Sequence, residues 1–168
     1  MSKITPFLWF DDQAEEAADF YVPIFSVRGD ASSGGGVSKI LDVTRYGEAG
    51  PGSPGHVMTV EFLLDGQRFT ALNGGPGHGL TDAISFVVSC DGQDEVDRLW
   101  TALTTDGGEE VACGWLKDRY GLSWQIVPTR LTELLLDPDP ERAQRAMEAM
   151  LEMKKIDIAA LERAVDAA

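Results

Sequence analysis

The sequence is poor in positive charge and lacks long apolar runs. Its 168 residues hold 14 Lys and Arg against 28 Asp and Glu, a formal net charge of −14. Such a charge repels phosphate backbones and anionic headgroups, so we expect neither nucleic acid nor membrane surfaces as partners. No stretch approaches the ~20 apolar residues of a membrane-spanning helix, and no apolar run follows a basic N-terminal region. These absences predict a cytoplasmic protein.

Cysteine and histidine are also scarce. Cys90 and Cys113 are the two cysteines, expected as reduced thiols because nothing indicates an oxidising compartment. His56 and His78 are the two histidines, and both lie in Gly/Pro-rich loops where solvation is the usual state. The chain also lacks a glycine fingerprint that opens a helix after a strand, so neither a nucleotide nor a methyl-donor site is expected. We therefore predict no cofactor.

What the chain does have is regular alternation between strand and helix patterns. In the first half, the apolar run 4–10 predicts a buried strand, and Asp11-Asp12 offer an N-cap to an amphipathic helix near 13–25. Asp65-Gly66 is a two-residue hairpin turn. Three further strands are expected at 37–46, 57–64 and 67–73.

The second half repeats this pattern after a Gly/Pro-rich break at 74–79. A strand is expected at 84–90, a helix near 93–105, and short strands near 115–118 and 122–127. Ile4, Asp11, Gln13 and Glu15 match Ile84, Asp91, Gln93 and Glu95 at a constant offset (93 − 13 = 80). This match predicts an internal duplication into modules 4–73 and 82–127.

A helical extension, residues 128–168, is expected to follow the second module. Pro128 stops the last strand, and Asp139-Pro140 is an N-cap followed by proline at the first helical position. Beyond it lies an apolar stripe that serves either internal packing or a partner subunit. Its members are Ala143, Ala146, Met147, Met150 and Met153.

The run CGWLKDRYGLSWQIVP, residues 113–128, resembles the signature of PhnB-like proteins of the vicinal-oxygen-chelate (glyoxalase/bleomycin-resistance/dioxygenase) superfamily. Phe20-Tyr21 and the stretch 150–157 agree with it. The resemblance implies a single α+β domain over residues 1–168, with two βαβββ modules whose eight strands curl around a central pocket. It also implies homodimers. Members of this family are often labelled 3-demethylubiquinone-9 3-methyltransferase.

The resemblance also implies where a metal would be held, because metal enzymes of the superfamily take ligands from the first and last strand of each module. The corresponding positions are Thr5, Thr70, Ser85 and Gln125, and a slip of one residue in the first strand would replace Thr5 with Pro6. Divalent metals prefer imidazole, carboxylate or thiolate, and neutral hydroxyls are poor ligands. We therefore predict no metal site.

Strand alternation suggests what the pocket contains instead. Thr5, Phe7 and Trp9 should share one face, together with Thr70, Leu72, Ser85, Val87, Ser123 and Gln125. Apolar walls with a few hydrogen-bonding groups are typical of a site for a small, partly aromatic molecule. The alternative is a filled core whose polar groups satisfy one another.

Three functions remain open on the sequence alone. The first is a metal-free protein that binds a small molecule, and the second is an enzyme acting on a small cytosolic metabolite. The weak catalytic candidates for the second are Cys113 and His78, since a reactive cysteine needs a nearby base or cation. The third is a dimeric protein without a small ligand.

Overall fold

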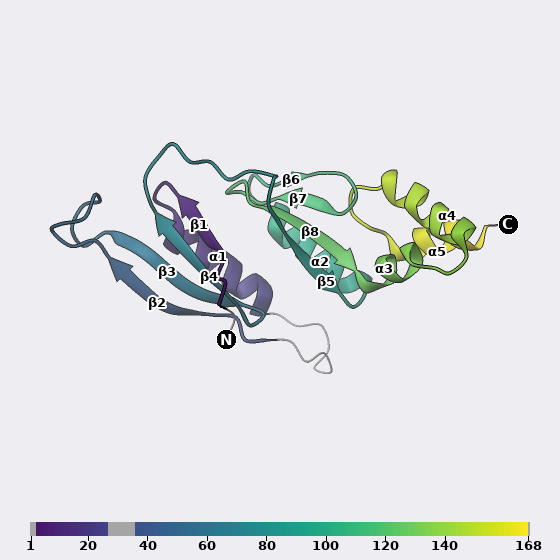
Figure 1. The fold of residues 1–168 in the computed structure, drawn as a ribbon, viewed down its shortest axis with the longest axis horizontal. Helices are drawn as coiled ribbons and strands as arrows, with labels where there is room; N and C mark the ends of the chain where they lie inside the picture. The colour runs from purple at the N-terminus through teal and green to yellow at the C-terminus, as the bar shows by residue number, and fades with distance from the viewer. Residues whose placement is uncertain (1–2, 27–35, 168) are drawn as a thin grey trace. The chain divides into compact units, whose positions relative to one another are not determined.

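The chain divides into two compact units, Met1–Leu80 and Thr81–Ala168, in a computed structural model that describes residues 3–26 and 36–167 (Figure 1). The boundary falls directly after the Gly/Pro-rich break. Each unit forms its own four-stranded sheet. No helix in the described part of the chain has the length and apolar character needed to span a membrane.

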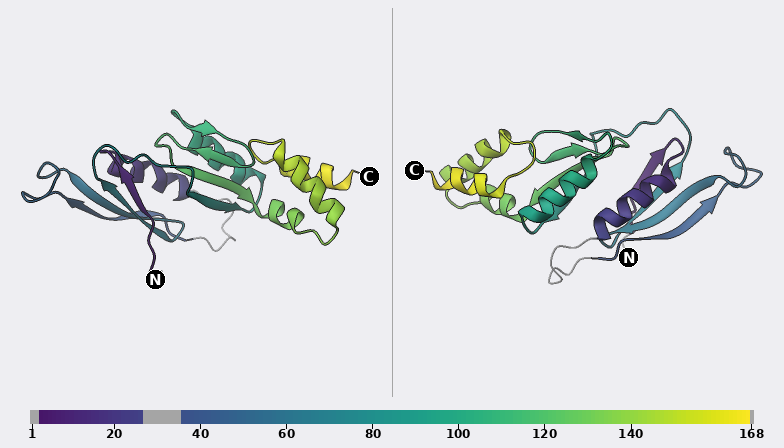
Figure 2. Two further views of the ribbon diagram at one scale, coloured as in Figure 1. Left: turned by 45° about the horizontal axis from the view of Figure 1, so that its top comes forward. Right: turned by 180° about the vertical axis from the view of Figure 1, so that it is seen from behind.

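Unit one places one helix against one face of its sheet (Figure 2). Its elements are β1 (Phe7–Phe10), α1 (Ala14–Ser26), β2 (Lys39–Arg45), β3 (Val57–Leu64) and β4 (Gln67–Asn73). The strand order is β1-β4-β3-β2, with β1 parallel to β4 and the other pairs antiparallel. Between sheet and helix, the rings of Tyr21, Phe62 and Phe69 stack, with centroids 6.4 and 5.6 Å apart. Each buried side chain of this kind contributes about 1.5–3 kcal/mol.

Two local expectations for unit one are wrong. The strand expected at 4–10 begins at Phe7, because Pro6 has no N–H to donate to a ladder. Asp11-Asp12 do not supply the cap of α1, which begins at Ala14. The N–H of Ala14 donates instead to Oδ1 of Asn73, 2.8 Å away at the end of β4. A residue distant in sequence therefore caps this helix.

Unit two repeats the arrangement and adds helices. Its elements are β5 (Ser85–Cys90), α2 (Gln93–Thr104), β6 (Glu109–Glu110), β7 (Trp115–Lys117), β8 (Ser123–Pro128), α3 (Thr129–Leu135), α4 (Pro140–Leu151) and α5 (Ile158–Asp166). The strand order is β5-β8-β7-β6. The sequence analysis missed β6, because two exposed glutamates carry no strand signal and only pairing with β7 defines it.

The predicted duplication is confirmed by sheet topology and register. Strand orders β1-β4-β3-β2 and β5-β8-β7-β6 are the same when the first strand of each unit is aligned. In the parallel pairs, Phe7 faces Thr70 as Val87 faces Gln125. The offsets are 80 for the first strand (87 − 7) and 55 for the last (125 − 70). The α+β fold of two βαβββ modules is therefore confirmed.

The C-terminal helices form a small core of their own. The side chain of Asp139 accepts from the N–H of Glu141 with Pro140 at the first helical position, as predicted for α4. The core comprises Leu131, Leu134, Ala146, Ile156, Leu161 and Val165, with Met150 and Met153 packed against it. Most of the apolar stripe thus serves internal packing, while Met147 is exposed.

Residues 153–158, which run from just after α4 to the first residue of α5, connect this helical core to the β-module; we call them the strap. The carbonyls of Met153 and Lys154 accept from the N–H groups of Cys113 and Gly114, at 2.8 and 2.7 Å. Gly114 has φ +84, and a Cβ there would lie 3.2 Å from Ile156. Glycine at 114 therefore allows the strap to approach closely.

Candidate functional site

Each sheet has a face opposite its helix, which we call the helix-free face. On the helix side of the sheet in unit one, the buried side chains include Leu8, Phe10, Phe69 and Ala71. Successive side chains of a strand point to opposite faces, so Phe7, Trp9, Thr70 and Leu72 lie on the helix-free face. The same argument puts Ser85, Val87 and Gln125 on the helix-free face of unit two. The alternation that grouped these residues within each unit is consistent with the structure.

The helix-free face of unit one is more charged than the sequence analysis anticipated. Phe7 is 60% exposed, and its partner Thr70 is largely buried. Thr70 pairs on its other side with Glu61, whose carboxylate lies 2.7 Å from the guanidinium of Arg68. The hairpin at Asp65-Gly66 fixes this pairing, so the signal for Glu61 was present in the sequence. Thr5 is half-buried and precedes β1.

Trp9 is held at the edge of this face by the segment after β4. Its Nε1–H donates to the carbonyl of Gly75 at 2.8 Å, and His78 meets the indole edge-on with centroids 4.7 Å apart. A Cβ at Gly74 would lie 2.2 Å from the ring, so only glycine fits there. His78 is therefore packed against Trp9, the aromatic side chain predicted to contact a ligand.

The helix-free face of unit two carries a compact polar group. Nε2 of Gln125 donates to Oγ of Ser85 at 2.8 Å, joining two of the predicted residues. Ser123, the Cα partner of Ser85, is fully buried, and its hydroxyl has no hydrogen-bond partner among the described residues. Val87, beside Gln125, is 58% exposed. Hydroxyl, amide and aliphatic groups thus lie together on two adjacent strands.

Trp115 is a residue of this face that the sequence analysis did not select. It is the Cα partner of Gln125 across β7 and β8. Hydrogen bonds join Gly114 to Ile126 and Asp118 to Leu122, so Trp115 and Gln125 form a non-hydrogen-bonded pair. Side chains of such pairs are the closest across an antiparallel ladder. Only the register of β7 against β8 reveals this contact.

The two cysteines have different surroundings. Cys113 is half-buried with φ 59, in the turn held by the strap. The nearby cation Lys117 lies 3.5 Å from the carboxylate of Asp82. Cys90 is buried, and loss of solvation, followed by the charge of Glu95, raises its pKa from 9.0 to about 12. Neither arrangement resembles an activated nucleophile paired with a base.

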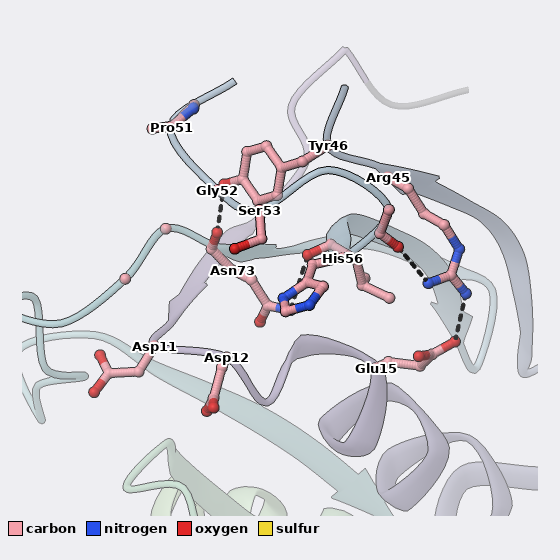
Figure 3. Close-up of a pocket in the computed structure, with 14 residues that line it drawn as sticks. Asp11, Asp12, Glu15, Arg45, Tyr46, Pro51, Gly52, Ser53, His56 and Asn73 are labelled. Carbon is pink, nitrogen blue, oxygen red and sulfur yellow. Dashed lines mark hydrogen bonds and ion pairs between the residues drawn. The ribbon is translucent and has the colours of Figure 1, made fainter. Parts of the chain in front are cut away.

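A separate pocket of about 500 Å³ lies within unit one (Figure 3). It is bounded by the end of β1, the start of α1, the end of β4 and the β2–β3 connection. Among its lining residues are Asp11, Asp12, Glu15, Tyr46, His56 and Asn73. None of the predicted ligand-binding residues lines it.

Hydrogen bonds fix the walls of this pocket. The hydroxyl of Tyr46 donates to the carbonyl of Asn73 at 2.6 Å, and Nδ2 of Asn73 donates to the carbonyl of Val57 at 3.1 Å. The β2–β3 connection runs so close to the Tyr46 ring that a Cβ at Gly52 would lie 2.4 Å from it. The charged lining residues are the carboxylates of Asp11, Asp12 and Glu15 and the guanidinium of Arg45, with Glu15 4.0 Å from Arg45. Such a lining suits a polar or cationic solute better than an aromatic one.

Comparison with known proteins identifies the family. The family described as 3-demethylubiquinone-9 3-methyltransferase matches residues 2–127, about three quarters of the chain. The chain belongs to this PhnB-like family of the vicinal-oxygen-chelate superfamily. The match ends at residue 127, so the C-terminal helices and the stretch 150–157 lie outside the matched residues.

Solved structures resemble this PhnB-like protein, among them two with TM-scores above 0.5. A PhnB protein from Bacillus cereus is 34% identical with a TM-score of 0.62, over 76% of this chain and 99% of that one. Protein PA1353 from Pseudomonas aeruginosa is 20% identical with a TM-score of 0.57, over 76% and 98%, and shares the fold. No curated protein matches the chain.

The residues present do not fit the metal that this superfamily implies. Thr5, Thr70, Ser85 and Gln125 offer hydroxyls and one amide, and Ser85 and Gln125 are hydrogen-bonded to each other. Across residues 3–26 and 36–167, no group of three or more His, Cys, Asp or Glu side chains is placed to hold a metal ion. Neutral oxygen donors of this kind bind zinc, nickel or iron poorly.

Proposed function

We propose that this PhnB-like protein binds a small, partly aromatic molecule without a metal. The observation that carries the proposal is the Gln125–Ser85 hydrogen bond of 2.8 Å on the helix-free face of unit two. By the resemblance, Gln125 stands at the position where a metal-dependent relative would need a strong ligand, and its side chain is a neutral amide. Exposed Val87 beside it supplies apolar contact surface. On unit one, Phe7 and Trp9 are proposed as ligand contacts of that unit's own helix-free face.

The residues support binding of a small molecule without methyl transfer. The family description names a methyltransferase, but this chain has no glycine fingerprint that would hold a nucleotide-like methyl donor. The second candidate is an enzyme acting on a small metabolite. It would require a nucleophile or base, and Cys113 and His78 both lie in structural contacts. We also propose that the protein is a homodimer in the cytoplasm.

A ligand screen tests the binding proposal directly. Small aromatic compounds are screened by thermal shift, and elemental analysis of the purified protein accompanies the screen. Gln125→Ala should weaken binding of a hit about tenfold or less, because one hydrogen bond contributes about 1 kcal/mol. For a hit that binds the helix-free face of unit one, Trp9→Ala should weaken binding through lost contact area. Gln67→Ala, in the exposed hairpin, is the matched control.

Three results would contradict the proposal. One equivalent of tightly bound metal would refute its metal-free part. Folded Gln125→Ala and Trp9→Ala variants that bind the hit as the wild type does would refute the site. Turnover of a metabolite in a panel assay would favour the enzyme.

A further inference from the structure

A row of three side chains crosses the helix-free face of unit two. Val87 on β5 and Trp115 on β7 are both Cα partners of Gln125 on β8, so the amide lies between an aliphatic and an aromatic side chain. Neighbouring strands lie about 4.8 Å apart. The row therefore spans about 10 Å, the length of a two-ring aromatic compound.

The hydrogen bond of Gln125 decides which polar group would complement this row. Nε2 donates to Ser85, whereas the carbonyl Oε1 has no hydrogen-bond partner among the described residues. The carbonyl has two lone pairs and accepts only. Covering it with a ligand that has no donor would leave it unsatisfied, which typically costs 1–3 kcal/mol.

A second row beside the first makes the adjoining surface polar. Lys117, Ser123 and Ser85 are Cα partners there, and the buried Ser123 hydroxyl has no partner in the described chain. Lys117 is paired with Asp82, which reduces its attraction for an anion. The net charge of −14 disfavours anionic ligands further.

We infer that Trp115 and Gln125 together determine ligand specificity, selecting a flat, uncharged aromatic compound that carries a hydrogen-bond donor such as a phenol O–H or a ring N–H. Trp115 contacts the ring, and Oε1 of Gln125 accepts from the donor. This inference rests on the proposed function and narrows it, because it specifies a donor on the ligand and assigns a role to a residue that strand patterns alone did not select.

The test compares two probes that share a ring system and differ in the donor. 2-Naphthol has a phenolic O–H, and 2-methoxynaphthalene has the same rings without it. Calorimetry with the full-length protein should give 2-naphthol five- to tenfold tighter binding, the effect of one hydrogen bond of about 1 kcal/mol. Gln125→Met keeps the length of the side chain and removes the carbonyl, so the ratio should fall to about one. Gln67→Met in the exposed hairpin should leave the ratio unchanged.

Variants at Trp115 test the aromatic half of the inference. Trp115→Leu should weaken both probes about tenfold, and Trp115→Phe, which keeps a ring, should weaken both less. The Phe variant also covers the case in which the Leu variant fails to fold. Equal affinity of the wild type for both probes would overturn the inference and leave the proposed function standing. A preference that survives Gln125→Met would overturn the role of Gln125. Binding of neither probe would overturn both proposals.

Discussion

At the scale of single residues, Asp118 shows how a buried charge organises the turn before β8. Its side chain is almost fully buried, and its two oxygens accept from the N–H groups of Tyr120 and Leu122 and from Nε1 of Trp124, at 2.8–3.1 Å. These bonds set the path of the chain into β8, where Ser123 and Gln125 follow. The position of the amide on the helix-free face thus depends on a carboxylate that contacts no ligand.

Replacing Asp118 should therefore lower the stability of the folded protein. Asp118→Ala leaves three donors without this acceptor, and we expect the free energy of unfolding to fall by about 3 kcal/mol or more. Urea unfolding followed by tryptophan fluorescence measures the change. Glu48→Ala, in the exposed β2–β3 connection, should shift it by less than about 0.5 kcal/mol. Equal effects of the two substitutions would contradict the structural role of Asp118.

The two thiols should differ in reactivity and in pH dependence. At pH 8 a thiol reagent should label Cys113, which is half-buried, while Cys90 should react only after unfolding. Folding raises the pKa of Cys90 from 9.0 to about 12, so its thiol contributes its full stability below pH 9. That contribution is lost as the pH rises from 9 towards 12. Rapid labelling of Cys90 in the native protein would contradict the burial of its side chain.

At the scale of elements, the strap is fastened to the start of α2 by one amide side chain. Gln93 donates through Nε2 to the carbonyl of Ile156 at 3.0 Å and accepts through Oε1 from the N–H of Ile158 at 2.9 Å. Lys155 pairs with Asp97 close by, and hydrogen bonds from Lys155 and then from Gln93 lower the pKa of Asp97. The stability from this carboxylate is thus present above its unfolded pKa and lost as the pH falls.

The internal duplication supplies a matched control for this contact. Gln13 occupies the equivalent position on unit one and is exposed. Among the described residues, its side chain accepts one long bond of 3.4 Å from the N–H of Asp12. Gln93→Ala should lower the free energy of unfolding by about 1–3 kcal/mol because two backbone groups of the strap lose their partner. Gln13→Ala should have little effect in the same urea titration. A larger effect at Gln13 would show that the strap contact adds little.

At the scale of the whole molecule, the charge and the fold point to how the protein behaves in solution. We propose a homodimer, because exposed apolar side chains such as Ile4, Phe7, Ile84 and Val87 flank or lie on strands at sheet edges. Multi-angle light scattering at micromolar concentration should give about twice the chain mass of 18.2 kDa. A monomer mass at that concentration would refute it. Measurement in moderate salt is advisable because a net charge of −14 per chain opposes association at low ionic strength.

The sequence by itself determined the elements and their repetition. Alternation and turn chemistry located the strands of both units except β6, and also the hairpin at Asp65-Gly66 and the cap at Asp139. The offset of 80 predicted the duplicated fold. These features are local, because a residue's period and turn preference are properties of its near neighbours.

Only the tertiary structure decided the contacts between distant segments. Asn73 caps α1, Trp115 lies beside Gln125, the strap bonds to Cys113 and Gly114, and the β2–β3 connection closes a pocket around Tyr46. Several of these contacts use backbone groups, which every residue type offers, or a strand register that a shift of one residue would invert. A local sequence pattern therefore predicts neither the backbone contacts nor the strand register.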